Sequence, residues 1–75
     1  MEKLPQDMHD LGLTKRQAQV GIGLIRQQTY EQIAQEARIN ERTVRQHATY
    51  AFQKVGCTKR EEFPEALMAS IQGLR

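Results

Sequence analysis

The chain has 75 residues, with 11 Lys and Arg residues against 9 Asp and Glu residues and a net charge of +2. This length corresponds to one small domain, and a core of this size supplies only about 3–5 kcal/mol of surplus stability. No apolar run approaches the ~18 residues that a membrane span needs. The N-terminus lacks an apolar core, so we expect no signal peptide. The single cysteine, Cys57, excludes an internal disulfide and a cysteine-rich zinc site, and it predicts a reducing, cytoplasmic setting.

The positive charge is concentrated in the second half of the chain. Residues 38–60 hold six Lys and Arg residues against one acid, Glu41, whereas residues 1–37 and 61–75 each carry a small negative charge. A basic block inside a near-neutral chain is typical of a surface that binds a polyanion. On charge alone, a solvated helix face is an equally good interpretation.

Residues 1–12 are polar, and we expect a flexible arm there, with room for one turn of helix near its end. The first helix is predicted to begin at Thr14, because Thr14 followed by Gln17 is a capping-box pattern. Gly21 and Gly23 each cost about 1 kcal/mol relative to Ala in a helix interior. The run VGIGLI also fits a strand, but a single strand has nothing to pair with. We therefore expect a helix, whose glycines mark a place where another helix packs closely.

A second start signal follows at Thr29, again with a glutamine, Gln32, three residues later. The helix that it begins is short and is predicted to end near Arg38. Asn40 is a suitable N-cap for the next helix. The buried side of the short helix is predicted to consist of Ile33, Ala34 and Ala37.

The clearest pattern predicts a helix over about residues 41–55. At roughly 100° per residue, one side is apolar and consists of Val44, Ala48, Ala51, Phe52 and Val55. The opposite side consists of Arg42, Arg45, Gln46, Thr49 and Gln53. Such donor-rich groups suit base edges, because Arg pairs with guanine and Gln with adenine. A flank between the two sides consists of Thr43, His47, Tyr50 and Lys54.

Gly56 occupies the expected C-cap position of that helix, and residues 58–60 form a basic turn. Pro64 inside a helix would cost about 3 kcal/mol, so the last helix is placed from about Phe63 or Pro64 to Gln72. Its apolar residues either close the core or form a dimer interface. They are Leu67, Met68 and Ile71, with Leu74 near the end.

One set of residues spans most of the chain: LTKR at 13–16, Val20, Thr29, IA at 33–34, Ile39, TVR at 43–45, His47, Phe52, Lys54, Gly56 and Arg60. From Leu13 to about Leu67, this pattern resembles the LuxR-type (GerE-type) DNA-binding domain. The resemblance implies an all-α fold of four helices in residues 13–75. The second and third helices would form a helix-turn-helix, the third would enter the major groove, and the fourth commonly contributes to dimerisation.

Carried over residue by residue, the resemblance implies base contacts by Arg45, Gln46 and Thr49. It implies backbone-contacting or helix-positioning roles for Thr29, Thr43, His47 and Lys54. From the residues themselves, Arg42 is a further base reader, or else binds phosphate or pairs with Glu41. Tyr50 either contacts a phosphate or packs at the helix flank. The chain departs from the family pattern at Gln17, Gly21, Gln27, Glu31, Gln32 and Pro64, where Gln27 replaces a glycine and Glu31 replaces a common lysine.

We therefore predict a DNA-binding transcriptional regulator that acts on double-stranded DNA as a homodimer and uses no cofactor or metal. No cluster of acids, histidines or serines has catalytic spacing, so an enzyme is not expected. Cys57 is interpreted as a small buried hydrophobe. RNA polymerase or a larger LuxR-type protein is a further candidate partner.

Two alternatives remain open at this stage. One is a LuxR-like protein-interaction module that inhibits a larger family member by heterodimerisation. The other is a promoter-binding domain that resembles region 4 of sigma factors. If the main prediction holds, the chain is either a stand-alone regulator controlled by its own abundance or the output module of a longer protein.

Overall fold

Helices form the whole framework of residues 4–74, which are the residues that the computed structural model describes. They are α1 (Leu4–Asp10), α2 (Lys15–Ile25), α3 (Tyr30–Ala37), α4 (Glu41–Val55), the short 3-10 helix η1 (Arg60–Glu62) and α5 (Phe63–Gly73). The predicted all-α class is confirmed. The four predicted helices correspond to α2, α3, α4 and α5, so the predicted helix-turn-helix is formed by α3 and α4.

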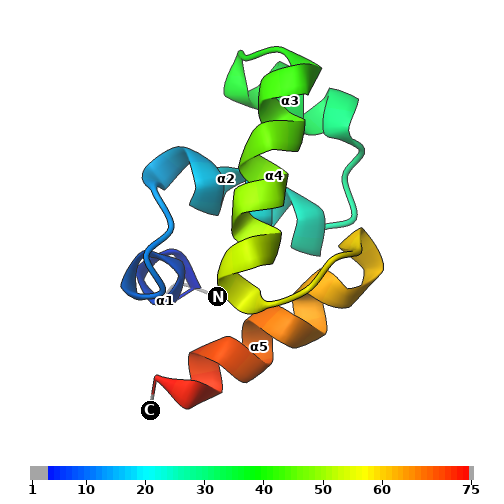
Figure 1. Ribbon diagram of the computed structural model, residues 1–75. Coiled ribbons are helices and arrows are strands. Elements are labelled where there is room, and N and C mark those ends of the chain that lie inside the picture. The colour runs from blue at the N-terminus through cyan, green and yellow to red at the C-terminus, as the bar shows by residue number, and fades with distance from the viewer. Residues whose placement is uncertain (1–3, 75) are drawn as a thin grey trace.

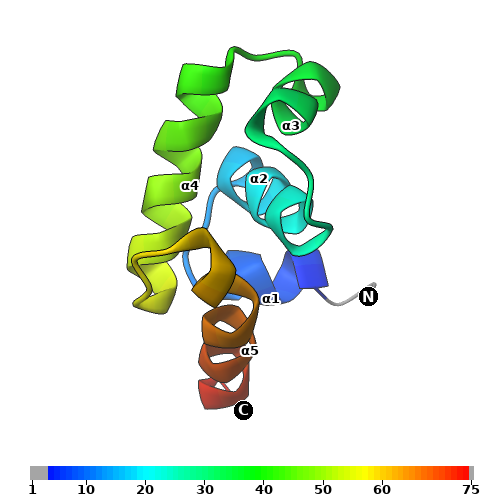
Figure 2. The ribbon, with the colours of Figure 1, turned by 90° about the vertical axis from the view of Figure 1, so that its right-hand side faces the viewer.

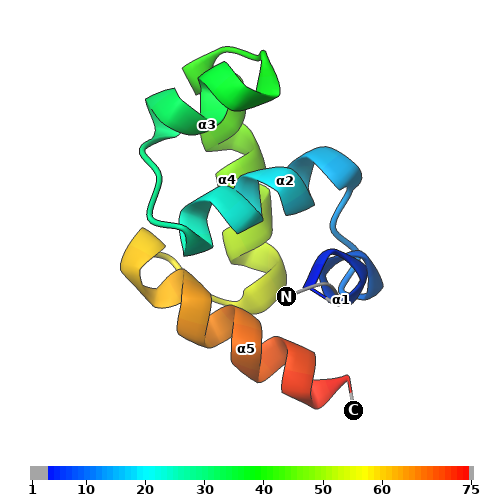
Figure 3. The same ribbon diagram turned by 180° about the vertical axis from the view of Figure 1, so that it is seen from behind.

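The helix α4 runs down the middle of the view in Figure 1, and α2 crosses behind it. Seen from the side, α2 and α3 both lie on the inner side of α4 (Figure 2). From behind, α1 and α5 lie below α2 and close the lower end of the molecule (Figure 3). The central helix is therefore α2, which contacts α1, α3, α4 and α5.

The two glycines of α2 lie where side chains of neighbouring helices come close to its backbone. A Cβ atom added to Gly23 would lie 2.7 Å from Cγ1 of Ile33 on α3. A Cβ atom added to Gly21 would lie 3.2 Å from Cε of Met8 on α1 and 3.3 Å from Cζ of Phe63 on α5. The run VGIGLI is thus a helix, and the prediction that its glycines mark close packing is confirmed.

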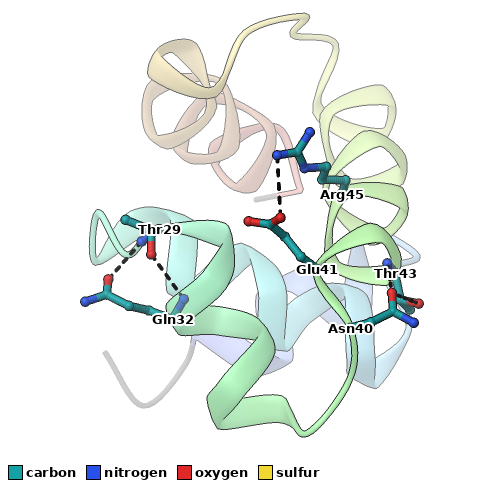
Figure 4. Close-up of polar contacts among 6 residues, drawn as sticks. All are labelled: Thr29, Gln32, Asn40, Glu41, Thr43 and Arg45. Carbon is teal, nitrogen blue, oxygen red and sulfur yellow. Dashed lines mark hydrogen bonds and ion pairs between the residues drawn. The ribbon is translucent and has the colours of Figure 1, made fainter.

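Both predicted capping boxes are present. The Thr14 hydroxyl accepts a hydrogen bond from the Gln17 N–H at 3.2 Å, and the Gln17 side chain accepts one from the Thr14 N–H at 3.0 Å. Thr29 and Gln32 make the same reciprocal pair at 3.1 and 2.9 Å (Figure 4). These bonds satisfy N–H groups that have no partner in the first turn of a helix, and they set where α2 and α3 begin.

The N-terminal segment differs from the expectation. Residues Leu4–Asp10 form α1, and Met8 is 0% exposed, so a flexible arm is the wrong description of this part of residues 1–12. Residues 1–3 lie outside the described residues. A helix of this length depends on tertiary contacts for its stability. Here Met8 supplies them by packing where Gly21 leaves room.

The turns on either side of α3 each place a non-glycine residue in the left-handed region. Gln27 has φ 62° and Arg38 has φ 58°. For residues with a side chain this conformation costs about 1–2 kcal/mol. Gln27 therefore adopts the backbone geometry that the glycine of the family pattern would adopt without that cost.

The last helix starts where it was predicted. Its first residue is Phe63, and Pro64 follows in the first turn, where the missing N–H leaves no helical hydrogen bond unmade. Phe63, Leu67 and Ile71 are buried in the core of the monomer. Pro64 consequently does not interrupt α5.

Gly23→Ala is expected to lower the free energy of unfolding by about 1–3 kcal/mol, because the added methyl group overpacks the contact with Ile33. Urea unfolding followed by circular dichroism measures this change. Gly73→Ala is the matched control, since its Cβ would meet no atom within 4 Å. Its stability should equal or exceed that of the wild type. Equal losses from the two substitutions would contradict the close approach at Gly23.

Candidate nucleic-acid interface

The candidate interface is built on α4, which is held to the rest of the molecule by small side chains. Val44, Ala48 and Ala51 are buried. Phe52 and Val55 are partly buried and pack against the core, and the Phe52 ring meets the Phe63 ring edge-on at a centroid distance of 5.6 Å. The predicted apolar face is therefore the one that packs inward, and short side chains on it permit a close approach to α2.

Both ends of α4 are defined by single residues. The Asn40 side-chain oxygen accepts hydrogen bonds from the Thr43 N–H at 2.7 Å and from the Thr43 hydroxyl at 2.9 Å (Figure 4). At the other end, Gly56 adopts φ 77°, a left-handed conformation that suits glycine. The predicted range of residues 41–55 is confirmed.

The relative position of α2 and α3 is supported by Arg16, the arginine of the LTKR run. Its Nη1 donates a hydrogen bond to the main-chain oxygen of Ala37 at 2.9 Å. Ala37 is the last residue of α3, so the guanidinium occupies the end of the helix where carbonyl groups lack partners and the dipole favours a cation. Arg16 thereby connects α2 to the end of α3 that precedes the turn into α4.

The predicted base-reading residues all lie on the exposed side of α4. Arg42, Arg45, Gln46 and Thr49 are exposed, as is Gln53. Gln46, Thr49, Tyr50 and Gln53 line one shallow hollow on this side. The Thr49 hydroxyl donates to the main-chain oxygen of Arg45 at 3.0 Å, which leaves its oxygen lone pairs free to accept.

Arg45 differs from its neighbours because its guanidinium already has partners. Its Nη2 lies 3.7 Å from Oε2 of Glu41, one turn earlier on α4 (Figure 4). Its Cζ also lies 5.5 Å from the ring centroid of Tyr30 on α3. The sequence left Arg42 as a candidate partner for Glu41, and the structure gives this ion pair to Arg45.

Two further residues, Tyr30 and Arg60, were not predicted as part of the site. Tyr30 carries the ring over which Arg45 lies, and the guanidinium of Arg60 lies 5.1 Å from the same ring centroid. Arg60 Nη2 also donates a hydrogen bond to the main-chain oxygen of Gln28. No local pattern connects these residues, because they meet only when α3, α4 and η1 come together.

The residues predicted to contact the DNA backbone are spread over two places. Thr43 and His47 are half-buried, Tyr50 and Lys54 are exposed, and all four lie on α4. Thr29 is at the start of α3, where its hydroxyl oxygen accepts from Gln32 and its hydroxyl proton is free to donate. Lys54 Nζ lies beside the Gly12 turn, 3.3 Å from the position that a Gly12 Cβ would take.

The predicted dimer residues on α5 divide into two groups. Leu67 and Ile71 are buried in the monomer, so their assignment to a dimer interface is corrected: they close the core. Met68 is 52% exposed and Leu74 is 48% exposed. An apolar stripe on a helix has the same sequence pattern whether its own chain or a partner covers it. Only the packing in the structure therefore distinguishes the buried pair from the exposed pair.

Cys57 is partly buried and packs against the core, broadly as interpreted from the sequence. Burial raises the pKa of its thiol above the ordinary value, the Glu62 carboxylate raises it further, and a backbone hydrogen bond offsets part of the rise. Over residues 4–74, no group of three His, Cys, Asp or Glu side chains is arranged to hold a metal ion. None of the helices in that range is both long enough and apolar enough to cross a membrane.

Residues 11–65 match the GerE family model, which describes bacterial regulatory proteins of the luxR family. This match covers most of the chain, and the chain belongs to that family. Its helix-turn-helix is therefore a DNA-binding element that serves transcription regulation. Searches of curated proteins and of solved structures gave no match to the chain.

Asn40→Ala is expected to lower the free energy of unfolding by about 0.5–2 kcal/mol, because the Thr43 N–H in the first turn of α4 loses its acceptor. Thermal unfolding by circular dichroism measures the loss. Asn40→Asp keeps the acceptor and is the matched control, with stability close to that of the wild type. If alanine and aspartate at this position are equally stable, the cap does not stabilise the start of α4.

Proposed function

We propose that the chain regulates transcription by placing α4 in the major groove of double-stranded DNA, with Arg42, Arg45, Gln46 and Thr49 directed at base edges. The observation that carries this proposal is the exposed side of α4 in a LuxR-family helix-turn-helix. That side carries guanidinium, amide and hydroxyl groups, and the acidic residue of α4, Glu41, lies in the first turn of the helix. Such a face offers hydrogen-bond donors that suit guanine and adenine.

The DNA backbone is contacted by residues beside this face. Thr43, His47, Tyr50 and Lys54 lie along α4, and Thr29 contributes from the start of α3. Phosphate contacts of this kind set the register of the recognition helix on DNA, whereas base contacts supply the sequence preference. One set of residues would therefore hold the protein on the DNA backbone, and a different set would recognise the base sequence.

The regulator acts as a homodimer in this proposal. Met68 and Leu74 are large apolar side chains left exposed on α5, which supports an interface there. Two copies would read related half-sites about one helical turn, roughly 34 Å, apart.

A second candidate function is inhibition of a larger LuxR-type protein through heterodimerisation. The observation that favours it is Glu31, an exposed acid in the first turn of α3 at the position where the family often has lysine. An acid there repels phosphate. Tight binding to a family partner, together with no binding to DNA at low salt, would establish this second function in place of the first.

Arg45→Ala is expected to reduce the preference for the cognate site over random DNA by about 1–3 kcal/mol. The cognate site is first obtained by selection from random DNA, and its footprint length reports one or two bound copies. Competition binding then measures the preference. Arg26→Ala, which removes the same charge at the C-cap of α2, is the control. Unchanged discrimination in Arg45→Ala would overturn its base-reading role.

Lys54→Ala is expected to weaken binding to cognate and random DNA equally, because phosphates are the same in every sequence. The slope of log affinity against log salt concentration should become shallower by about 1. Titrations at several salt concentrations give this slope, with Arg26→Ala again as the matched control. A loss confined to the cognate site would instead make Lys54 a base reader.

Met68→Glu is expected to convert the dimer to a monomer and to halve the DNA footprint, because a charge would be buried against the partner helix. Sedimentation velocity measures the first effect. Ala69→Glu places the same charge at a neighbouring exposed position of α5 and should leave the dimer intact. A wild-type protein that sediments as a monomer when bound to its site would exclude the α5 interface.

A further inference from the structure

The Arg45 side chain is held although most of it is in water. Its side chain is 63% exposed, yet Glu41 contacts one edge of the guanidinium and the Tyr30 ring lies within 5.5 Å of its central carbon. An unrestrained exposed arginine samples many rotamers, and ordering it on binding costs up to about 2 kcal/mol of rotamer entropy. These two contacts restrict that freedom before any DNA is present.

The two contacts have different consequences for base recognition. Glu41 forms an ion pair with Nη2 at 3.7 Å, on an edge of the guanidinium that can also pair with guanine. An aromatic ring attracts the cation through its face and leaves the planar fork of N–H donors available. The ring contact is therefore compatible with bidentate pairing to a base, whereas the Glu41 carboxylate competes with a base for the Nη2 edge.

The Tyr30 ring is itself held in place. Tyr30 is the first residue of α3, it is half-buried, and it packs against the core. Arg60 approaches the same ring to 5.1 Å, and the hydrogen bond from Arg60 to the Gln28 main chain anchors this second guanidinium. The position of the ring thus depends on its place in α3, on its packing against the core and on the Arg60 guanidinium of η1.

We propose that Tyr30 is a positioning residue for Arg45 and, through it, a determinant of base specificity that does not itself touch a base. The ring directs the guanidinium so that its donors are presented to the major groove at the point where the helix-turn-helix meets η1. The inference rests on the proposed base-reading role of Arg45. It assigns a specificity function to α3, a helix whose predicted DNA contact was to the backbone alone.

The test is a double-mutant cycle between residues 30 and 45, read as the preference for the selected site over random DNA. Tyr30→Leu keeps an apolar side chain at the core but removes the ring, and it is expected to lower the preference about two- to fivefold, the range for an exposed cation–π pair. Tyr30→Phe keeps the ring and should retain the wild-type preference. In the Arg45→Ala background, Tyr30→Leu should cause no further loss.

Three outcomes of the cycle would overturn the proposal. If Tyr30→Leu lowers the preference for the selected site as much in the Arg45→Ala background as in the wild type, the ring acts independently of Arg45. If Tyr30→Phe lowers this preference as much as Tyr30→Leu does, the effect belongs to the hydroxyl group, as expected for a phosphate contact. Arg45→Ala leaving the preference unchanged would overturn the base-reading role itself, and with it this inference, so the two failures are distinguishable.

A measurement on free wild-type protein tests the contact without relying on the folding of any variant. A proton lying over an aromatic ring is shifted upfield in the NMR spectrum. The side-chain resonances of Arg45 should lie upfield of those of Arg42, an exposed arginine on the same helix. Coincident resonances for the two arginines would show that Arg45 does not lie over the ring in solution and would overturn the proposal.

Discussion

Gly21 and Gly23 let side chains of the helices around α2 come so close that a Cβ atom at Gly23 would overlap Ile33 and one at Gly21 would make tight contacts with Met8 and Phe63. Met8, Ile33 and Phe63 each occupy space beside one of these glycines, so α1, α3 and α5 all meet at α2. The buried residues of α4, which are Val44, Ala48 and Ala51, are also small, so α4 can pack closely on the remaining side of α2. A protein of this size has few large core residues, and close packing of helix backbones makes those few sufficient.

The recognition surface follows from this framework. Because α4 is held along one side, its opposite side faces solvent over its whole length (Figure 2). The Asn40 N-cap and the Gly56 C-cap set the two ends of α4, and the residues between them carry the exposed polar side chains of this surface. Arg16 and Arg60 then connect neighbouring elements through main-chain carbonyl groups, so two arginines stabilise the framework instead of serving as free positive charge.

Much of the fold was predictable because its signals are local. The capping boxes at Thr14 and Thr29, the Asn40 cap and the Gly56 terminus each involve groups within about one helical turn, and the structure confirms all of them. The N-terminal helix was not predictable in this way. Its described part has one fully buried apolar residue, Met8, and a single residue gives no periodicity. The same limit applied to α5, where Leu67 and Ile71 share an apolar stripe with Met68 but differ from it in burial.

By itself, the sequence determined the helices α2, α3, α4 and α5 and the side of α4 that carries arginine, amide and hydroxyl groups, because these depend on caps and spacing along one helix. Tertiary structure alone decided which apolar residues of α5 remain available to a partner and which side chains surround Arg45. Tyr30 and Arg60 are each 15 residues from Arg45 in the sequence, and the two guanidinium groups approach the Tyr30 ring only after α3, α4 and η1 have packed. Contacts between elements carry no signature in the local pattern, since each depends on the distance and angle between two helices.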